Sequence, residues 1–130
     1  FYAVYNNETG YFLFSSGGSP KPLYYSNFFN KIDFLDIEGP LVGMTEESQY
    51  YETSIKLAHN DTLFLFTDGA YEIFNDNNKM LGDEKLKSIF LKNMHKNINV
   101  IKENMIKELK NFSNNSLPDD ISMIFLRRTD

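Results

Sequence analysis

The amino-acid sequence predicts a single α+β domain in which antiparallel strands are combined with two amphipathic helices. Three observations lead to this class. Short apolar runs separated by Gly, Pro, Asn and Asp occupy residues 1–66, which is typical of antiparallel strands joined by turns. Residues 86–112 instead carry apolar side chains at helical spacing. A last apolar run at residues 121–126 returns to the strand pattern.

Length and composition exclude several classes of protein. The 130 residues, 42% of them hydrophobic, suffice for one domain with a core of its own. The 18 acidic residues exceed the 13 basic ones and give a net charge of −5, which argues against nucleic acid as a partner. No apolar run approaches the roughly 18 residues of a membrane span. The absence of cysteine excludes disulfides and thiolate chemistry and fits a cytoplasmic location.

The first predicted element is a hairpin. Residues 1–5 and 11–14 are apolar and aromatic, and the intervening loop at residues 6–10 ends in glycine. Because a strand-like segment opens the sequence without an initiating Met, we expect the chain to be the C-terminal portion of one domain whose upstream part is absent. The alternative is a chain trimmed at a natural domain edge.

Further strands are expected up to the middle of the chain. Residues 17–22 contain Gly and Pro and predict a loop, after which residues 23–25 resume a strand. Residues 28–37 predict one or two more strands, and residues 38–40 a turn. An alternating strand is predicted at residues 50–57.

The second half begins with a central strand. Residues 63–66 are apolar without interruption, which indicates that both faces of that strand are covered. Two helices follow, each with one apolar face. Their apolar residues are Leu86, Ile89, Phe90 and Met94 in the first, and Ile101, Met105, Leu109 and Phe112 in the second. A polar loop at residues 113–116 then leads toward the last strand.

Two aspartates stand where this topology brings strand ends together. Asp68 follows the central strand, and Asp119 precedes the last one. If these strands are antiparallel neighbours, both carboxylates lie at one edge of the sheet. Neighbouring carboxylates repel unless a proton or a cation lies between them, and Mg²⁺ or Mn²⁺ prefers such oxygen ligands. Alternatively, Asp68 and Gly69 form an ordinary turn, and Asp119 is an ordinary solvated residue before a strand.

Five motifs in one order resemble a known family. Residues 18–23, 40–43, 61–69, 81–86 and 119–122 read GSPKPL, PLVG, DTLFLFTDG, LGDEKL and DDIS. Together they resemble the second half of the SpoIIE-type domain, a metal-dependent Ser/Thr phosphatase domain similar to protein phosphatase 2C. The resemblance covers nearly the whole chain. It implies an antiparallel β-sandwich flanked by helices (α-β-β-α) with a two-metal site at one edge.

The resemblance also implies roles for single residues. Asp68 and Asp119 correspond to family aspartates that bind the metal ions, Mn²⁺ or Mg²⁺, and they are therefore the expected catalytic residues. Gly69 is expected to let the backbone turn at the metal site. Glu72 lies where relatives of the eukaryotic type carry a further acid near the metals. Asp120 is expected to support the site or to cap the strand.

Several features depart from the family or fall outside it. The family's Gly-Asp-x-Tyr-Asp and Asp-Val-x-Gly-His-Gly segments, which supply the other metal ligands, do not occur in these residues. Ser19 stands where the family usually has His. His59 and His95 are predicted to be solvated, and residues 75–78 are predicted to form a turn and not a calcium loop.

For the complete domain, the resemblance implies hydrolysis of phosphoserine or phosphothreonine by water that two metal ions activate. The implied substrate is a phosphoprotein of the anti-sigma-factor antagonist type in bacterial signalling, and the implied upstream partner is a sensor domain. The alternative function is a noncatalytic regulatory or interaction module derived from a phosphatase. The 130 residues alone are expected to be nearly inactive and to form a homodimer or exchange a strand.

Overall fold

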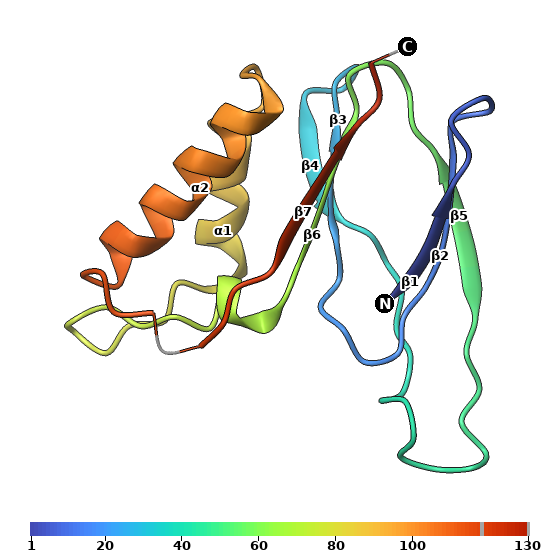
Figure 1. The fold of residues 1–130 in the computed structure, drawn as a ribbon, viewed down its shortest axis with the longest axis horizontal. Coiled ribbons are helices and arrows are strands. Elements are labelled where there is room, and N and C mark those ends of the chain that lie inside the picture. Colours follow the sequence, from blue (N-terminus) through green and yellow to red (C-terminus); the bar gives the residue numbers. More distant parts are fainter. Residues whose placement is uncertain (118, 130) are drawn as a thin grey trace.

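The chain forms three layers, of which the first is helical and the other two are antiparallel sheets (Figure 1). A computed structural model describes residues 1–117 and 119–129. The two helices cover the outer face of a four-stranded sheet, and a three-stranded sheet packs against its other face. The predicted α+β class is confirmed. The family resemblance implies a helical layer on each side of the two sheets. In the described residues, the two helices form one of these layers.

The three-stranded sheet contains the predicted hairpin. Its strand order is β1 (Tyr2–Tyr5), β2 (Tyr11–Ser15) and β5 (Glu52–Lys56), and both pairings are antiparallel. Alternate residues of β2 are buried and exposed, as expected of a strand with one covered face. Val4 and Leu13 are cross-strand partners on the outer face, where both are exposed.

The four-stranded sheet carries the two strands that matter most for the candidate site. Its order is β4 (Lys31–Phe34), β3 (Leu23–Ser26), β6 (Thr62–Phe66) and β7 (Met123–Arg127). Strand β6 lies inside this sheet, pairs with β3 and β7, and is buried almost throughout. The central strand predicted from its uninterrupted apolar run is therefore confirmed.

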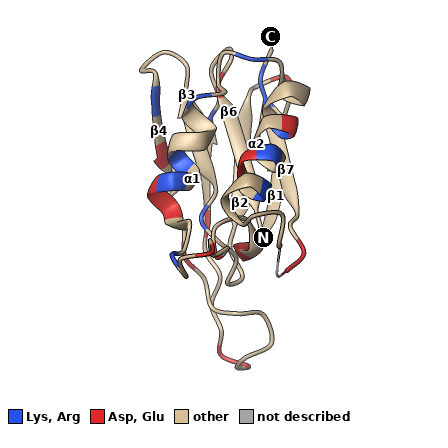
Figure 2. Ribbon diagram, turned by 90° about the vertical axis from the view of Figure 1, so that its left-hand side faces the viewer, with Lys and Arg blue, Asp and Glu red and all other residues tan. Residues whose placement is uncertain are grey.

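The helices α1 (Gly82–Leu91) and α2 (Ile98–Phe112) turn their apolar faces toward this sheet. Charged residues mark the helix surfaces in the view onto the helices (Figure 2). The side chain of Asn97 accepts a hydrogen bond of 3.0 Å from the Asn99 backbone N–H and caps α2. None of the helices in the described residues is long and apolar enough to cross a membrane.

Two apolar cores hold the layers together. The core between helices and sheet is centred on Phe64, whose ring stacks on Phe125 at a centroid distance of 4.5 Å and meets Phe90 at 5.0 Å. The core between the sheets contains Phe12, Phe14 and other residues of both sheets. Since β6 contributes to both cores, its position is fixed from both faces.

A buried carboxylate fixes the start of β6. Asp61 is 1% exposed and accepts hydrogen bonds from the Tyr24 hydroxyl at 2.6 Å and from the backbone N–H groups of Asn27 and Ala58 at 2.8 Å. Three donors from three segments thus satisfy one buried acid. Burial, followed by the hydrogen bond to Asp61, raises the pKa of Tyr24 to about 12.

The prediction for residues 28–37 was only partly right. Strand β4 covers only Lys31–Phe34. Residues 27–30 instead form a turn in which Asn30 has a φ of 49°, and Phe28 and Phe29 are exposed. Asn30 tolerates the left-handed region and completes this turn, so β4 begins only after it. The two phenylalanines before it fit a strand pattern but belong to the turn. The other predicted helices and strands differ only at their ends, and the turn predicted at residues 38–40 lies instead at residues 42–43.

Candidate metal edge

The candidate site lies where β6 ends and β7 begins. The two strands are antiparallel, and Phe66 pairs with Met123 at their last rung. Beyond the strands, the Thr67 N–H donates to the Ser122 carbonyl at 3.1 Å, and the Ser122 N–H donates to Thr67 Oγ1 at 3.1 Å. The pairing assumed in the sequence analysis is therefore confirmed, and it continues up to the two aspartate motifs.

A short turn follows the end of β6. Residues Asp68–Ala70 form a single 3₁₀ turn, in which the Ala70 N–H donates to the Thr67 carbonyl at 3.0 Å. The Glu72 N–H then donates to the Asp68 carbonyl at 2.9 Å. These bonds keep Asp68 at the tip of the strand.

Glycine is needed at position 69 because there is no room for a Cβ atom. A Cβ atom on Gly69 would lie 2.7 Å from the carbonyl oxygen of Asp120. In the described part of the chain, Gly69 is not among the residues with positive φ. The expected freedom to turn sharply is thus not what this position requires. The missing side chain lets the backbones of the two aspartate motifs approach each other.

Both aspartate side chains are exposed and are oriented by local hydrogen bonds. Asp68 Oδ1 accepts a hydrogen bond of 2.9 Å from the Gly69 N–H, and Asp119 Oδ1 accepts one of 2.8 Å from the Asp120 N–H. Each bond occupies one oxygen of its carboxylate. Backbone N–H groups thereby orient both carboxylates at the same edge of the sheet.

Further acidic side chains surround Tyr71, which follows the 3₁₀ turn. Burial raises the pKa of the Tyr71 hydroxyl, and the charges of Glu72, Asp83 and Asp68 add to this in that order. Three acidic residues thus lie close enough to Tyr71 to act on its hydroxyl.

The donor type fits a hard divalent cation, whereas the number of donors is too small. Carboxylate oxygens are the ligands that Mg²⁺ and Mn²⁺ prefer. Within residues 1–117 and 119–129, however, no group of three or more His, Cys, Asp or Glu side chains is arranged to hold a metal ion. Asp68 and Asp119 can therefore supply part of a metal site, and additional oxygen ligands are needed to complete it.

The other residues singled out in the sequence lie outside this edge or beside it. Glu72 is exposed near Asp68, and Asp120 contributes its backbone carbonyl to the close contact with Gly69. His59 and His95 are exposed residues of turns. Residues 75–78 form a turn in which the Asn75 side chain accepts two backbone hydrogen bonds, as predicted.

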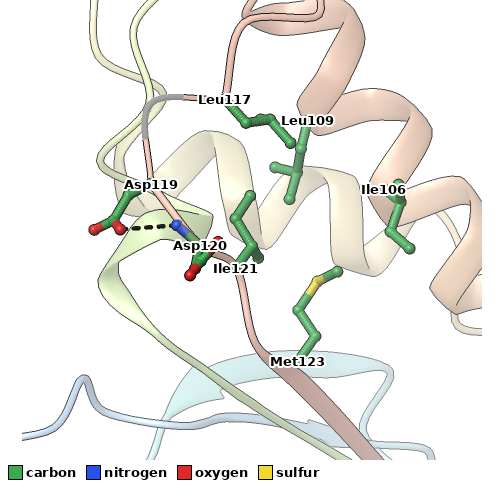
Figure 3. Close-up of a pocket in the computed structure, with 7 residues that line it drawn as sticks. All are labelled: Ile106, Leu109, Leu117, Asp119, Asp120, Ile121 and Met123. Carbon is green, nitrogen blue, oxygen red and sulfur yellow. Dashed lines mark hydrogen bonds between the residues drawn. The ribbon is translucent and has the colours of Figure 1, made fainter.

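Sequence reasoning missed two features of the site. Thr67 links the two motifs through hydrogen bonds of its backbone and its hydroxyl to Ser122. Its place in the Thr-Asp-Gly motif was the signal that could have indicated this role. A groove beside Asp119, shown in Figure 3, was also missed. Its lining residues come from α2 and from the segment before β7, so only the tertiary structure brings them together.

The sequence matches the family described as Stage II sporulation protein E (SpoIIE) over residues 1–129. Phosphoserine phosphatase RsbU of Bacillus subtilis (strain 168) is 28% identical over 128 residues, which are 98% of this chain and 38% of RsbU. The chain thus spans well under half of that relative.

Two solved structures resemble the fold. The RsbU and RsbW domains of Rv1364c from Mycobacterium tuberculosis match with a TM-score of 0.76 and 17% identity, over 93% of this chain and 33% of that one. The phosphatase domain of the cell fate determinant SpoIIE from Bacillus subtilis, presoaked with Mn, matches with a TM-score of 0.72 and 15% identity. That match covers 98% of this chain and 55% of the SpoIIE structure. At identities of 17% and 15%, these similarities show a shared fold.

Proposed function

Because the chain belongs to the SpoIIE family, we propose that it forms part of a metal-dependent protein phosphatase domain, which hydrolyses phosphoserine or phosphothreonine on a protein. One observation carries the proposal. The hydrogen bonds between Thr67 and Ser122 hold the Asp68 and Asp119 motifs side by side at an exposed edge. The name of the relative RsbU, a phosphoserine phosphatase, supports the same reaction class.

Asp68 and Asp119 are the residues of this chain that would hold Mn²⁺ or Mg²⁺, with Glu72 as a candidate for a further acid nearby. Remaining ligands would come from segments outside these 130 residues. When bound, such ions lower the pKa of water and offset charge on a phosphoryl group. No side chain of this chain then has to act as a nucleophile.

The other residues of the edge position these carboxylates. Gly69 keeps the two backbones close, and its N–H orients the Asp68 carboxylate. The Asp120 N–H does the same for Asp119. Tyr71, a neutral phenol at physiological pH, adds no negative charge among the acids near Asp68. A phosphorylated substrate therefore meets carboxylates that are already oriented.

For the substrate, we propose a phosphoprotein of the anti-sigma-factor antagonist type, acted on in the bacterial cytoplasm under the control of an upstream sensor domain. The similarity to RsbU and to a structure that joins RsbU and RsbW domains supports this choice. The family resemblance supports it as well. This assignment is finer than the reaction class and depends on it.

The reaction class can be tested by measuring phosphate release. A polypeptide that contains these residues together with the upstream segments is incubated with a phosphoserine protein and Mn²⁺. Asp68→Asn and Asp119→Asn are each expected to abolish the release, because each removes a charged ligand. Asp33→Asn, a matched change on β4 at the far edge of the same sheet, should leave it intact. Full activity of either site variant would rule out the assignment.

We propose a noncatalytic regulatory or interaction module as the alternative function. The two family segments that supply the other metal ligands do not occur in these 130 residues. The upstream sequence of the same gene decides between the two functions. Aspartates in both expected segments support the enzyme, and their absence supports the module.

A further inference from the structure

A groove lies directly beside the candidate metal edge (Figure 3). It has a volume of about 330 Å³, near the lower end of the range for ligand-binding pockets. Seven residues line it, from α2, the segment before β7 and β7 itself. They are Ile106, Leu109, Leu117, Asp119, Asp120, Ile121 and Met123. The groove thus shares Asp119 with the candidate metal edge.

The groove combines apolar side chains with two acidic residues. Ile106, Leu109 and Met123 lie on one side of the groove and Asp119 and Asp120 on the other, with the Asp119 carboxylate directed away from the apolar side chains (Figure 3). None of the described lining residues carries a positive charge. A ligand that suits this groove therefore combines an aliphatic part with a cationic end.

We propose that this groove binds a Lys or Arg side chain of the phosphoprotein substrate, close in sequence to the phosphorylated residue. The proposal rests on the proposed phosphatase function. Lys and Arg bury an aliphatic stem along apolar surface while their charged head stays at a polar edge. Here the stem would lie against Ile106 and Met123, and the head would reach the carboxylate of Asp120.

Charge complementarity favours this occupant over others. An apolar residue such as Leu would fill the apolar part but leave the acidic residues without a partner. An acidic residue would be repelled by Asp119 and Asp120. A hydrogen bond from a cationic head to an exposed carboxylate is one of the stronger kinds, because both partners are ionised.

The position of Asp119 sets the spacing on the substrate. Asp119 belongs both to the groove and to the candidate metal edge, so a phosphoserine at that edge lies beside the groove. An extended chain advances about 3.3–3.6 Å per residue, so we expect the basic residue within about three positions of the phosphoserine. The groove would thus read the sequence around the phosphorylation site.

The test compares phosphoserine peptides that differ at one position, scanned over three residues on each side. That position holds Lys, norleucine, which has the stem without the charge, or Ser. The enzyme is the polypeptide with its upstream segments, in Mn²⁺, and kcat/KM for each peptide is divided by that for p-nitrophenyl phosphate. We expect the Lys peptide to exceed the Ser peptide about tenfold at the best position, with norleucine between them.

Two variants and a control distinguish the contribution of the aliphatic stem from that of the charged head. Asp120→Asn should bring the Lys-to-norleucine ratio to about one, because it removes the charge without changing the shape. Ile106→Ser should lower the advantage of both Lys and norleucine over Ser. Val100→Ser is the matched control, since Val100 is an exposed β-branched residue of α2 that does not line the groove. It should leave all ratios unchanged.

Each other outcome overturns the proposal in its own way. Activity on p-nitrophenyl phosphate with equal use of all peptides would overturn the groove's role and leave the phosphatase function standing. A preference for norleucine over Lys would overturn the cationic occupant. Unchanged ratios in Ile106→Ser would overturn the contact between the groove and the aliphatic stem, and a changed mass by light scattering would show that a second copy occupies the groove instead. No activity on any substrate would overturn the phosphatase function and the groove's role with it.

Discussion

At the scale of single residues, the space beside Gly69 is too small for a side chain, because the Asp120 carbonyl lies there. A methyl group on Gly69 would come within 2.7 Å of the Asp120 carbonyl oxygen, so the two motifs would have to move apart. We expect Gly69→Ala to lower the free energy of unfolding by about 1–3 kcal/mol, the usual cost of overpacking. Urea unfolding followed by circular dichroism measures this. A loss below about 0.5 kcal/mol would show that the motifs are not held this tightly.

A second residue-scale prediction concerns pH. The pKa of Tyr24, about 12 in the folded chain, lies above the value of about 10 in an unfolded one. Folding therefore favours the protonated phenol. Its contribution to stability is complete below pH 10 and is lost as the pH rises toward 12. Tyr24→Phe should lose less stability than the unmodified chain between pH 9 and 12 in urea unfolding, and an equal loss in both proteins would contradict this.

At the residue level, the sequence predicted the strand pairing beside the two aspartate motifs but not the network around Asp61. Asp68 and Asp119 stand out because each borders an apolar strand, and strand order brings them together. Asp61 also precedes β6, yet its three donors come from β3, the turn after it and the turn after β5. The Ala58 N–H is a local donor, but the donors from Tyr24 and Asn27 depend on tertiary packing, so no local pattern indicates that this acid is buried.

At the scale of elements, the cap of α2 offers a direct test. The Asn97 side chain accepts a hydrogen bond from the Asn99 N–H at the start of the helix. Asn97→Ala should lower the free energy of unfolding by about 1 kcal/mol, because an N–H at the helix start loses its acceptor. Asn99→Ala changes the same residue type two positions later and should have a smaller effect. Equal losses in thermal unfolding would show that the cap contributes nothing.

The elements also show where sequence patterns succeed. Both helices were predicted from their apolar spacing, and the residues so identified are buried against the sheet, among them Leu86, Ile101 and Leu109. The stretch at residues 28–37 misled the prediction because Phe28 and Phe29 have high strand propensity but are 83% and 74% exposed in a turn. Strand propensity describes which backbone conformations a residue tolerates. Here the left-handed conformation of Asn30 determines where the chain turns.

At the scale of the whole molecule, the outer face of the three-stranded sheet makes a prediction about association. Val4 and Leu13 are exposed there as cross-strand partners, and β1 is an edge strand. We expect the 130 residues alone to be nearly inactive and to self-associate, because an apolar sheet face and a free edge invite pairing. Light scattering should give a mass above that of the monomer, and Val4→Lys should lower it. A monomeric, fully active chain would contradict both expectations.

The central claim is that Asp68 and Asp119 hold one divalent cation together. Mn²⁺ binding by isothermal titration calorimetry, on the polypeptide with its upstream segments, tests it most directly. Asp68→Asn and Asp119→Asn should each weaken binding at least about tenfold, because a carboxylate ligand is replaced by a neutral amide. Asp33→Asn, at the opposite edge of the sheet, should bind Mn²⁺ as the unmodified protein does. Unchanged binding in either site variant, or an equal loss in the Asp33 control, would contradict the claim.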